Sequence, residues 1–312
     1  MNATEKPVTI DHDNPSVTVS EKPSEGQSSA KQGKSQSKSA IKDSAANIAS
    51  IATRYHLDAE ITSPSSGLSI DKRIQARSVQ IQERRQLNLE KIIAFAHASC
   101  RDEAASTPDD DWLYRFFDMA QDIGNSAMQR LWAQVLKREV INPGSTSIKS
   151  LKLLKDLSAK EAQIIQRGAS LASTFGGDGA NKLIIGYRAK SSLFSLGRTN
   201  DNTTLNLGSF QLPYSSLLLL VELGVLIGTE LESGEIETNP AVVVTYQGKH
   251  LALEPHSKGL RLVYYRFSPI GNELCRLLGN KPNMKYHDQL LALLSQKFTI
   301  TSEVKSSIST SA

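Results

Sequence analysis

The chain has 312 residues, of which 39% are hydrophobic and 22% are charged, and its formal net charge is +4 at pH 7. This length allows about two domains with a core in each, and the apolar and charged fractions are those of an ordinary soluble globular protein. The mild positive charge neither requires nor excludes nucleic acid, so the local distribution of cations has to decide between partners.

The cysteines and the apolar runs indicate the cellular compartment of the protein. Cys100 and Cys275 lie far apart and form no metal or redox motif, which indicates a reducing cytosol and excludes a disulfide framework. The first residues, MNATEKPVTIDHDNP, contain no apolar h-region, so we expect no signal peptide. The longest apolar run, 217–228, is short and interrupted by Glu222, which predicts a core helix and not a membrane span. We therefore expect a cytoplasmic protein.

Residues 1–70 are predicted to be a disordered tail and linker, and residues 301–312 a second disordered tail. The segment GQSSAKQGKSQSKSA (26–40) cannot bury enough apolar surface to offset the entropy of the chain. Its lysines could tether nucleic acid or a membrane, but nearby carboxylates dilute its basic character, which favours a solubilising tail. Between 46 and 69 the segment AANIASIATRYHL is compatible with a short helix that TSPSSG breaks.

A long basic helix is predicted from Asp71 to about Ser99. Its apolar stripe is weak at first and firm later, where Leu89, Ile92 and Ala96 recur at helical spacing. Cations outnumber carboxylates along it, and the basic residues are Lys72, Arg73, Arg77, Arg84, Arg85 and Lys91. Such a helix could lie on phosphates or anionic lipid, although a solvated face is the commoner role.

The next predicted helix begins after Pro108, where three aspartates favour a helix start. Its apolar face is predicted to hold Trp112, Phe116, Met119 and Ile123. Asp111, Asp118 and Asp122 fall on the opposite side and could suggest a metal site. Arg115 projects from that side too, so we expect exposed ion pairs there instead of a metal.

Capping signals separate the helices that follow. Gly124 ends the first, and Ser126 with Gln129 is predicted to form a capping box for the second. A third helix is expected at about 147–156, and Ser158 with Glu161 is predicted to cap a fourth.

The two tryptophans, Trp112 and Trp132, are predicted to share one core. The sequence Asn142-Pro143-Gly144 predicts a turn, because proline presets φ and glycine tolerates a left-handed conformation. Helices with short connections predict a helical bundle domain over residues 71–175.

This stretch also carries a resemblance. The segments DDDWLYRFFDMAQDI (109–123) and LWAQVLKREVINPGSTSIKSLKLLKDLSAKEA (131–162) follow RRQLNLEKII (84–93). Together they resemble a bacterial domain family of unknown function with a W-x-x-R-F-F helix, an L-W-A-x-V-L helix, an N-P-G-S turn and an L-S-x-x-E-A end. The resemblance covers residues 72–300 and supplies no catalytic residues. More distantly, the pattern is similar to alpha-type abortive-infection proteins, which implies a role in phage defence.

Residues 176–300 are predicted to form a small α+β domain. Strands are expected at 183–187, 241–246 and 260–268. In the segment 212–228 a helix is expected to end at Gly224, and further helices are expected from Pro269 and at about 284–298. A helix, a two-strand ribbon and a further helix in this order resemble a winged-helix domain. The predicted fold class is therefore mainly α: a disordered N-terminal tail, a helical bundle and a winged-helix-like α+β domain.

Winged-helix domains often bind DNA, so the charge map matters. From Thr199 to Gly248 there is no lysine or arginine, which is unsuitable for a recognition helix on DNA. The ribbon 249–266 is more basic. The candidate nucleic-acid contacts are Arg73, Arg77, Arg84 and Arg85 of the basic helix 72–91, and Lys249, Lys258 and Arg261 of the ribbon.

No catalytic or metal motif stands out. The six histidines are scattered, and a metal held by His250, Glu254 and His256 is less favoured than a solvated turn. We expect no cofactor, no metal and, leaning only on absent motifs, no enzyme. The leading hypothesis is a non-enzymatic protein-interaction or regulatory module that binds a partner protein or its own copy. The alternatives are a nucleic-acid-binding protein and a phage-defence effector.

Overall fold

The computed structural model describes residues 43–61, 68–189, 201–279 and 281–303. The chain divides into two compact units, residues 1–67 and residues 68–312. Of the predicted disordered tails at 1–70 and 301–312, residues 1–42, 62–67 and 304–312 lie outside the described residues. Among the described residues, no helix combines the length and the hydropathy that a membrane span requires.

The described part of the first unit contains one helix, α1 (Ser44–Arg54). Asp43 caps it by accepting a hydrogen bond from the backbone N–H of Ala45. The short helix that the sequence allowed at this point is therefore confirmed. Its apolar side chains Ile48 and Ile51 are exposed.

The second unit begins with five helices: α2 (Ile70–Ser99), α3 (Asp110–Ala120), α4 (Ser126–Ile141), α5 (Ile148–Asp156) and α6 (Ala159–Ser170). The rings of Trp112 and Trp132 both lie against Phe116, with centroids 5.2 and 5.3 Å away. The Trp112 indole donates a hydrogen bond to the Thr146 carbonyl at 2.8 Å. The predicted common core of the two tryptophans is confirmed.

Local capping signals were predicted with mixed success. The capping box of Ser158 and Glu161 at the start of α6 is confirmed. The box of Ser126 and Gln129 is wrong, because Asn125 caps α4 and accepts from the backbone N–H groups of Ala127 and Met128. Gln129 turns inward and donates to the Ile123 carbonyl at 2.9 Å.

Antiparallel strands dominate the rest of the second unit. The strands are β1 (Ser173–Thr174), β2 (Asn181–Ala189), β3 (Asp201–Thr204), β4 (Leu231–Glu232), β5 (Val242–Tyr246), β6 (Lys249–Pro255), β7 (Leu260–Arg266) and β8 (Phe298–Glu303). They form one eight-stranded sheet in the order β4-β7-β2-β1-β5-β6-β8, with β3 paired to β2.

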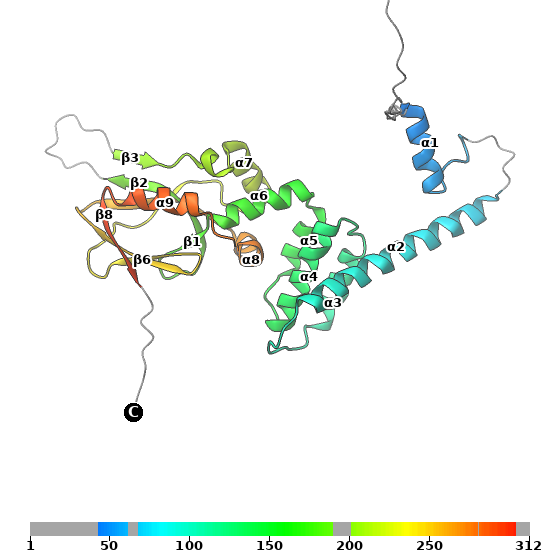
Figure 1. The fold of residues 1–312 in the computed structure, drawn as a ribbon, viewed down its shortest axis with the longest axis horizontal. Helices are drawn as coiled ribbons and strands as arrows, with labels where there is room; N and C mark the ends of the chain where they lie inside the picture. The colour runs from blue at the N-terminus through cyan, green and yellow to red at the C-terminus, as the bar shows by residue number, and fades with distance from the viewer. Residues whose placement is uncertain (1–42, 62–67, 190–200, 280, 304–312) are drawn as a thin grey trace, which may run out of the picture. The chain divides into compact units, whose positions relative to one another are not determined.

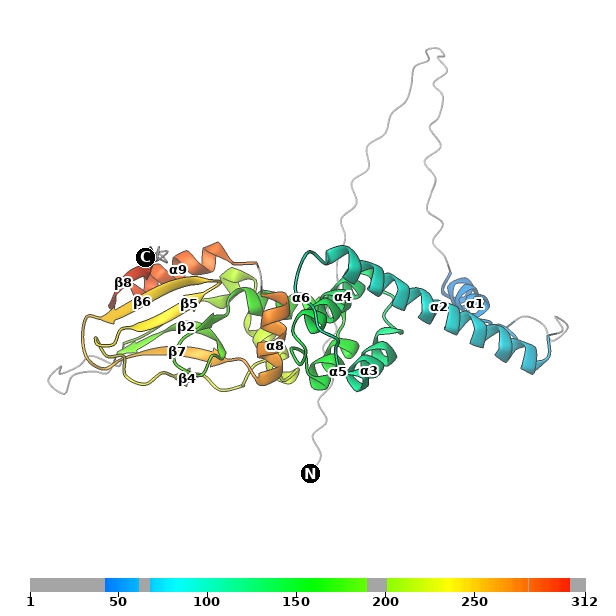
Figure 2. The same cartoon turned by 90° about the horizontal axis from the view of Figure 1, so that it is seen from below.

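Three helices and a short 3-10 helix accompany the sheet: η2 (Leu207–Phe210), α7 (Tyr214–Glu222), α8 (Pro269–Leu278) and α9 (Met284–Leu294). Helix α9 lies on the sheet (Figures 1 and 2), where the Tyr286 hydroxyl donates to the Ile184 carbonyl of β2 at 2.7 Å. Helix α8 packs against α5 and α6. There its Glu273 carboxylate accepts from the Ser147 N–H and the Ser150 hydroxyl.

The predicted fold class is wrong: the strands of the described residues form one eight-stranded antiparallel sheet, and these residues form no winged-helix-like domain. The strands expected at 241–246 and 260–268 do not pair with each other. β5 pairs with β6, and β7 pairs with β2 and β4. The segment 249–266 is thus not a ribbon: it contains two strands, β6 and β7, that pair with different neighbours in the sheet.

The turn between β5 and β6 gives the physical reason. Gln247 and Gly248 have φ of +47° and +83°, the left-handed pair that joins adjacent antiparallel strands through two residues. Strand β6, hidden in the sequence by its mixed composition, therefore takes the place beside β5. One continuous hydrophobic core runs through helices and sheet of residues 68–312. Their division into domains at 175/176 stays a prediction.

Candidate interaction surface

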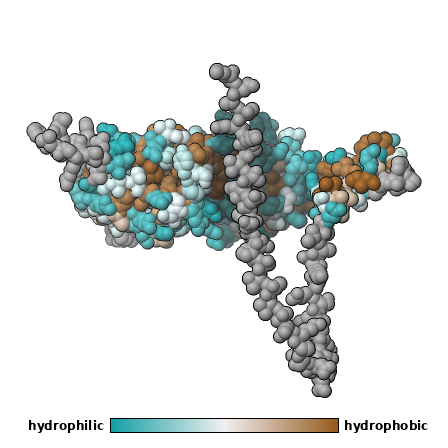
Figure 3. All heavy atoms as spheres, turned by 90° about the horizontal axis from the view of Figure 1, so that it is seen from above, coloured by the Kyte–Doolittle hydropathy of each residue, from teal (hydrophilic) through white to brown (hydrophobic). Residues whose placement is uncertain are grey.

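Helix α2 has one apolar face with two different surroundings. At about 100° per residue, Ile70, Ile74 and Ile81 fall on the same side of the helix as Asn88 and Ile92. In the C-terminal half this side packs against α4, and Ile92 is fully buried. In the N-terminal half, Ile70 is 63% exposed and Ile74 61% exposed. Figure 3 shows that apolar side chains, in brown, are exposed on the surface; the exposed ones include those of α1, which belongs to the first unit.

A cationic flank runs beside that apolar face. It consists of Arg73, Arg77, Arg84 and Lys91, which fall within an arc of about 40° along roughly 27 Å of helix. These four cations form no ion pair with any described residue. The carboxylates of the helix, Asp71, Glu83 and Glu90, point roughly a quarter-turn or more away from the centre of the flank. The N-terminal half of α2 therefore presents an apolar stripe next to uncompensated positive charge.

The structure separates the cations predicted to bind nucleic acid. Arg73, Arg77 and Arg84 share the cationic flank of α2, but Arg85 turns to Asp122, with Nε 2.9 Å from Oδ1. Arg261 of β7 forms an ion pair with Glu232 at 3.3 Å.

The two predicted lysines of the sheet are exposed but apart from each other. Lys249 begins β6, and Lys258 lies in the turn that follows this strand. Figures 1 and 2 agree that the sheet and the N-terminal half of α2 lie at opposite ends of the second unit. The seven predicted residues therefore do not form one basic groove.

The acidic side of α3 also differs from expectation. Asp122 pairs with Arg85, and Asp118 accepts from the side chain of Gln121 at 3.1 Å. Arg115 forms no ion pair with the described residues, so the expected pairs with Asp111 and Asp118 are wrong. It lines a groove of about 460 Å³ between α3 and α5 with other charged side chains: Asp118, Lys152, Lys155 and Asp156.

The histidine positions predicted to be solvated have ordinary partners. The His250 ring lies 2.9 Å from the Thr245 hydroxyl, and the His256 ring 3.2 Å from the Thr299 hydroxyl. Within the part of the chain that the structure describes, no three His, Cys, Asp or Glu residues are grouped so as to hold a metal ion.

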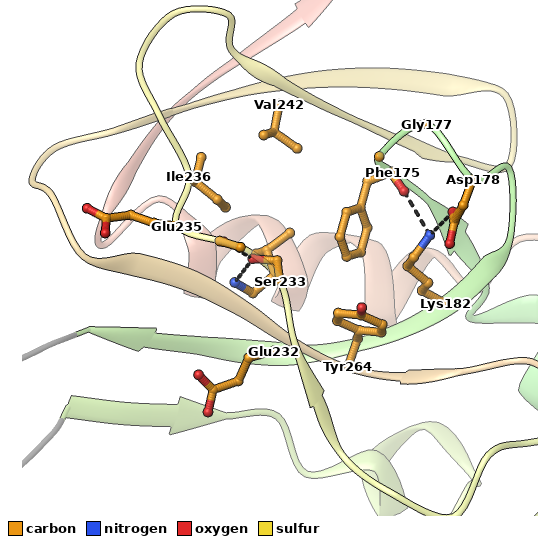
Figure 4. Close-up of a pocket in the computed structure, with 13 residues that line it drawn as sticks. Phe175, Gly177, Asp178, Lys182, Glu232, Ser233, Glu235, Ile236, Val242 and Tyr264 are labelled. Atoms are coloured by element: carbon orange, nitrogen blue, oxygen red, sulfur yellow. Dashed lines mark hydrogen bonds and ion pairs between the residues drawn. The ribbon is translucent and has the colours of Figure 1, made fainter.

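A cavity in the sheet region was not foreseen. It measures about 410 Å³ and lies between the β1–β2 turn, β4 with the segment after it, and β7 (Figure 4). Lys182, whose side chain is 4% exposed, donates to Asp178 Oδ1 at 2.6 Å and to the Phe175 carbonyl at 2.8 Å. That hydrogen bond lowers the pKa of the Asp178 carboxyl. The only sequence signal was a lysine four residues after an aspartate, across a glycine-rich turn.

Comparisons with known proteins bear on identity and not on chemistry. No curated protein and no solved structure matches the chain. One family model, described as "Protein of unknown function (DUF2806)", matches residues 72–291. The individual motifs of the resemblance, and the likeness to abortive-infection proteins, stay predictions. The match runs from the first turn of α2 into α9 and covers well over half of the chain, and the chain therefore belongs to the DUF2806 family of proteins of unknown function.

Proposed function

We propose that this chain is a protein-interaction module that binds an acidic, amphipathic helix of a partner protein along the N-terminal half of α2. The observation that carries the proposal is the apolar face of α2, which is buried at Ile92 and exposed at Ile70 and Ile74. Helices that bind other proteins use apolar anchor residues spaced about one and two turns apart. Ile70 and Ile74 are one turn apart, and Ile74 and Ile81 are two turns apart.

The apolar stripe supplies the affinity. Burying one isoleucine side chain that was exposed contributes about 1.5–3 kcal/mol before the cost of association is subtracted. Ile70 and Ile74 together, with the half-buried Ile81, are enough for a contact of moderate strength. A nucleic acid would match the cations of the flank but would leave these isoleucines in water.

The cationic flank selects the charge of the partner. Arg73, Arg77 and Arg84 stand beside the stripe, so a bound helix needs carboxylates on the matching side. A second copy of the chain is disfavoured. An antiparallel, two-fold pair that sets Ile74 against Ile81 would also bring Arg73 of one copy close to Arg84 of the other.

Photo-crosslinking identifies the partner and maps the surface at once. A photoreactive amino acid at position 74, in cells that express the full chain, is expected to crosslink to a segment that is helical, apolar on one side and acidic. Position 79 provides the matched control, because Val79 is 51% exposed and lies on the opposite side of the helix. Equal crosslinking from both positions would contradict the proposed surface.

Binding of the identified segment, synthesised as a peptide, is then measured by fluorescence anisotropy. Ile74→Ser is expected to weaken binding about tenfold or more, whereas Val79→Ser, which changes helix propensity by a similar amount, leaves it unchanged. Arg77→Gln is expected to weaken binding and flatten its salt dependence, while Lys72→Gln, off the flank, has a smaller effect.

The same variants distinguish the other occupants. If oligonucleotides bind the wild type and lose affinity with Arg77→Gln but not with Ile74→Ser, the surface serves nucleic acid and the proposal is wrong. If position 74 crosslinks only to another copy of the chain, the partner is the protein itself.

A further inference from the structure

We propose that the cavity between the β1–β2 turn, β4 and β7 binds a neutral, planar aromatic ring that carries a carbonyl acceptor, a chemistry shared by nucleobases and aromatic amides. The cavity measures about 410 Å³, which is within the range of small-molecule sites. It lies on the sheet, apart from the α2 surface, so it adds a second activity to the proposed function.

Aromatic and aliphatic side chains form the walls. The rings of Phe175 and Tyr264 meet edge to face, with centroids 5.1 Å apart, and both border the cavity in Figure 4. Ile236 and Val242 face them across the space. Because flat rings pack well against such aromatic pairs, the walls favour a planar ligand.

Lys182 stabilises the wall of the cavity, and its ammonium group has no donor left for a ligand. Its ammonium donates to the Asp178 carboxylate and to the carbonyls of Phe175 and Ala180, at 2.6, 2.8 and 3.1 Å. These bonds use all its donors. The ammonium also lies 4.7 Å from the centroid of the Phe175 ring, which fixes that ring in place.

The remaining charges around the cavity balance, which favours a neutral ligand. The Glu232 carboxylate pairs with both Arg188 and Arg261, so one negative charge is shared by two guanidinium groups. Glu235 forms no ion pair within the described part of the chain, and its carboxylate accepts the Gly259 N–H at 2.6 Å. Both carboxylates extend away from the aromatic pair in Figure 4. Together with Glu235, these groups carry two positive and two negative charges, so neither an anion nor a cation meets a net charge of opposite sign at the rim.

Hydrogen-bond donors remain at the cavity. Among the described residues, nothing pairs with the Tyr264 hydroxyl or with the backbone N–H groups of Gly176 and Gly177. The Ser233 hydroxyl, by contrast, is used: it donates to the Gly234 carbonyl and accepts the Leu262 N–H. Gly176 and Gly177 are exposed to solvent, so their N–H groups are open to a ligand that carries acceptor atoms in the plane of its ring.

The test titrates the full chain with benzamide and with benzoate, which have nearly the same shape and differ in charge, and with uracil and hypoxanthine as nucleobases. Amide NMR shifts of Gly176 and Gly177 report binding at the cavity. Benzamide is expected to bind at least about tenfold more tightly than benzoate. If the nucleobases bind more tightly than benzamide, the ligand is a nucleobase. If benzamide binds more tightly, the ligand is an aromatic amide. Either result supports the proposal.

Two matched tyrosine variants test the hydroxyl. Tyr264→Phe is expected to weaken benzamide binding roughly two- to tenfold, the effect of one hydrogen bond. Tyr265→Phe is the control, because the Tyr265 hydroxyl donates to Glu230 outside the cavity, and it should leave binding unchanged. Unchanged melting temperatures show that both variants fold.

Three results would overturn the proposal: equal or tighter binding of benzoate, equal loss in both tyrosine variants, or no shift of Gly176 and Gly177 up to the solubility of every probe. The α2 variants Ile74→Ser and Arg77→Gln should not change these titrations, so the cavity can fail without affecting the proposed interaction surface.

Discussion

In the C-terminal half of α2, Asn88 and Ile92 lie buried against other helices, whereas in the N-terminal half Ile70 and Ile74, on the same side of the helix, are exposed to solvent. The two halves share one periodicity and one continuous backbone. The difference lies in the neighbours alone, since α3 and α4 contact α2 only along part of its length. The exposed part of this face, together with the cationic flank beside it, is the basis of the proposed function.

The largest loss of stability should come from Ile92, in the buried half of α2. Ile92→Ala removes a fully buried side chain and is expected to lower the free energy of unfolding by about 2–5 kcal/mol, because a cavity is left in a packed core. Urea unfolding followed by circular dichroism measures it. A loss below about 1 kcal/mol would show that the C-terminal half is not packed as described.

The next largest loss of stability is expected at Asn88, the buried polar residue on the same face of α2. The Asn88 side chain donates to the Gln121 carbonyl at 2.9 Å and accepts from Gln129 at 3.1 Å. Asn88→Ala leaves these groups short of a partner, which should cost about 1–3 kcal/mol of unfolding free energy. If the same urea experiment gave wild-type stability, the hydrogen bonds of Asn88 would not contribute to holding α2 against α3 and α4.

A smaller effect is expected where the buried half of α2 meets solvent. Arg85 and Asp122 form an ion pair, but their side chains are 33% and 39% exposed, so water screens the attraction. Arg85→Gln should therefore cost no more than about 1 kcal/mol, and less at high salt. Thermal unfolding at low and high salt is the measurement; a cost that rises with salt would exclude an ionic origin.

The smallest change in stability should be that of Ile74→Ala, within about 0.5 kcal/mol of wild type, because the side chain has little to lose on the surface. Its effect should appear in partner binding instead. A large loss of stability in the isolated chain would mean that Ile74 is covered within the protein, and it would remove the basis of the proposed function.

Signals within a few turns of chain predicted the helices well. The stretch 109–162 contains α3, α4 and α5 and the confirmed capping box of Ser158, since helical periodicity and capping act over three or four residues. The prediction of a box at Ser126 failed by one position. A neighbouring Asn125 is an equally good cap, and its backbone is extended there, with φ of −77° and ψ of 125°.

The candidate site was only partly predictable. The sequence located the basic helix 72–91. It could not show that Arg85 would turn to Asp122 while Arg73, Arg77 and Arg84 form no ion pair with any residue that the structure describes. The cavity was missed altogether, because Phe175 and Tyr264 are brought together only by the sheet.

By itself, the sequence determined the helices of residues 70–170, the Asn-Pro-Gly turn with Gly144 at φ of +79°, and the shared core of the two tryptophans, because these depend on local periodicity and local backbone preference. Only the tertiary structure decided the sheet. β2 pairs with β7 so that Lys182 meets Arg266 and Ala189 meets Leu260, residues far apart along the chain. Pairing at that distance leaves no periodic mark, since each strand shows only its own alternation. The tertiary structure likewise decided which half of α2 is exposed, because α3 and α4 cover only the other half.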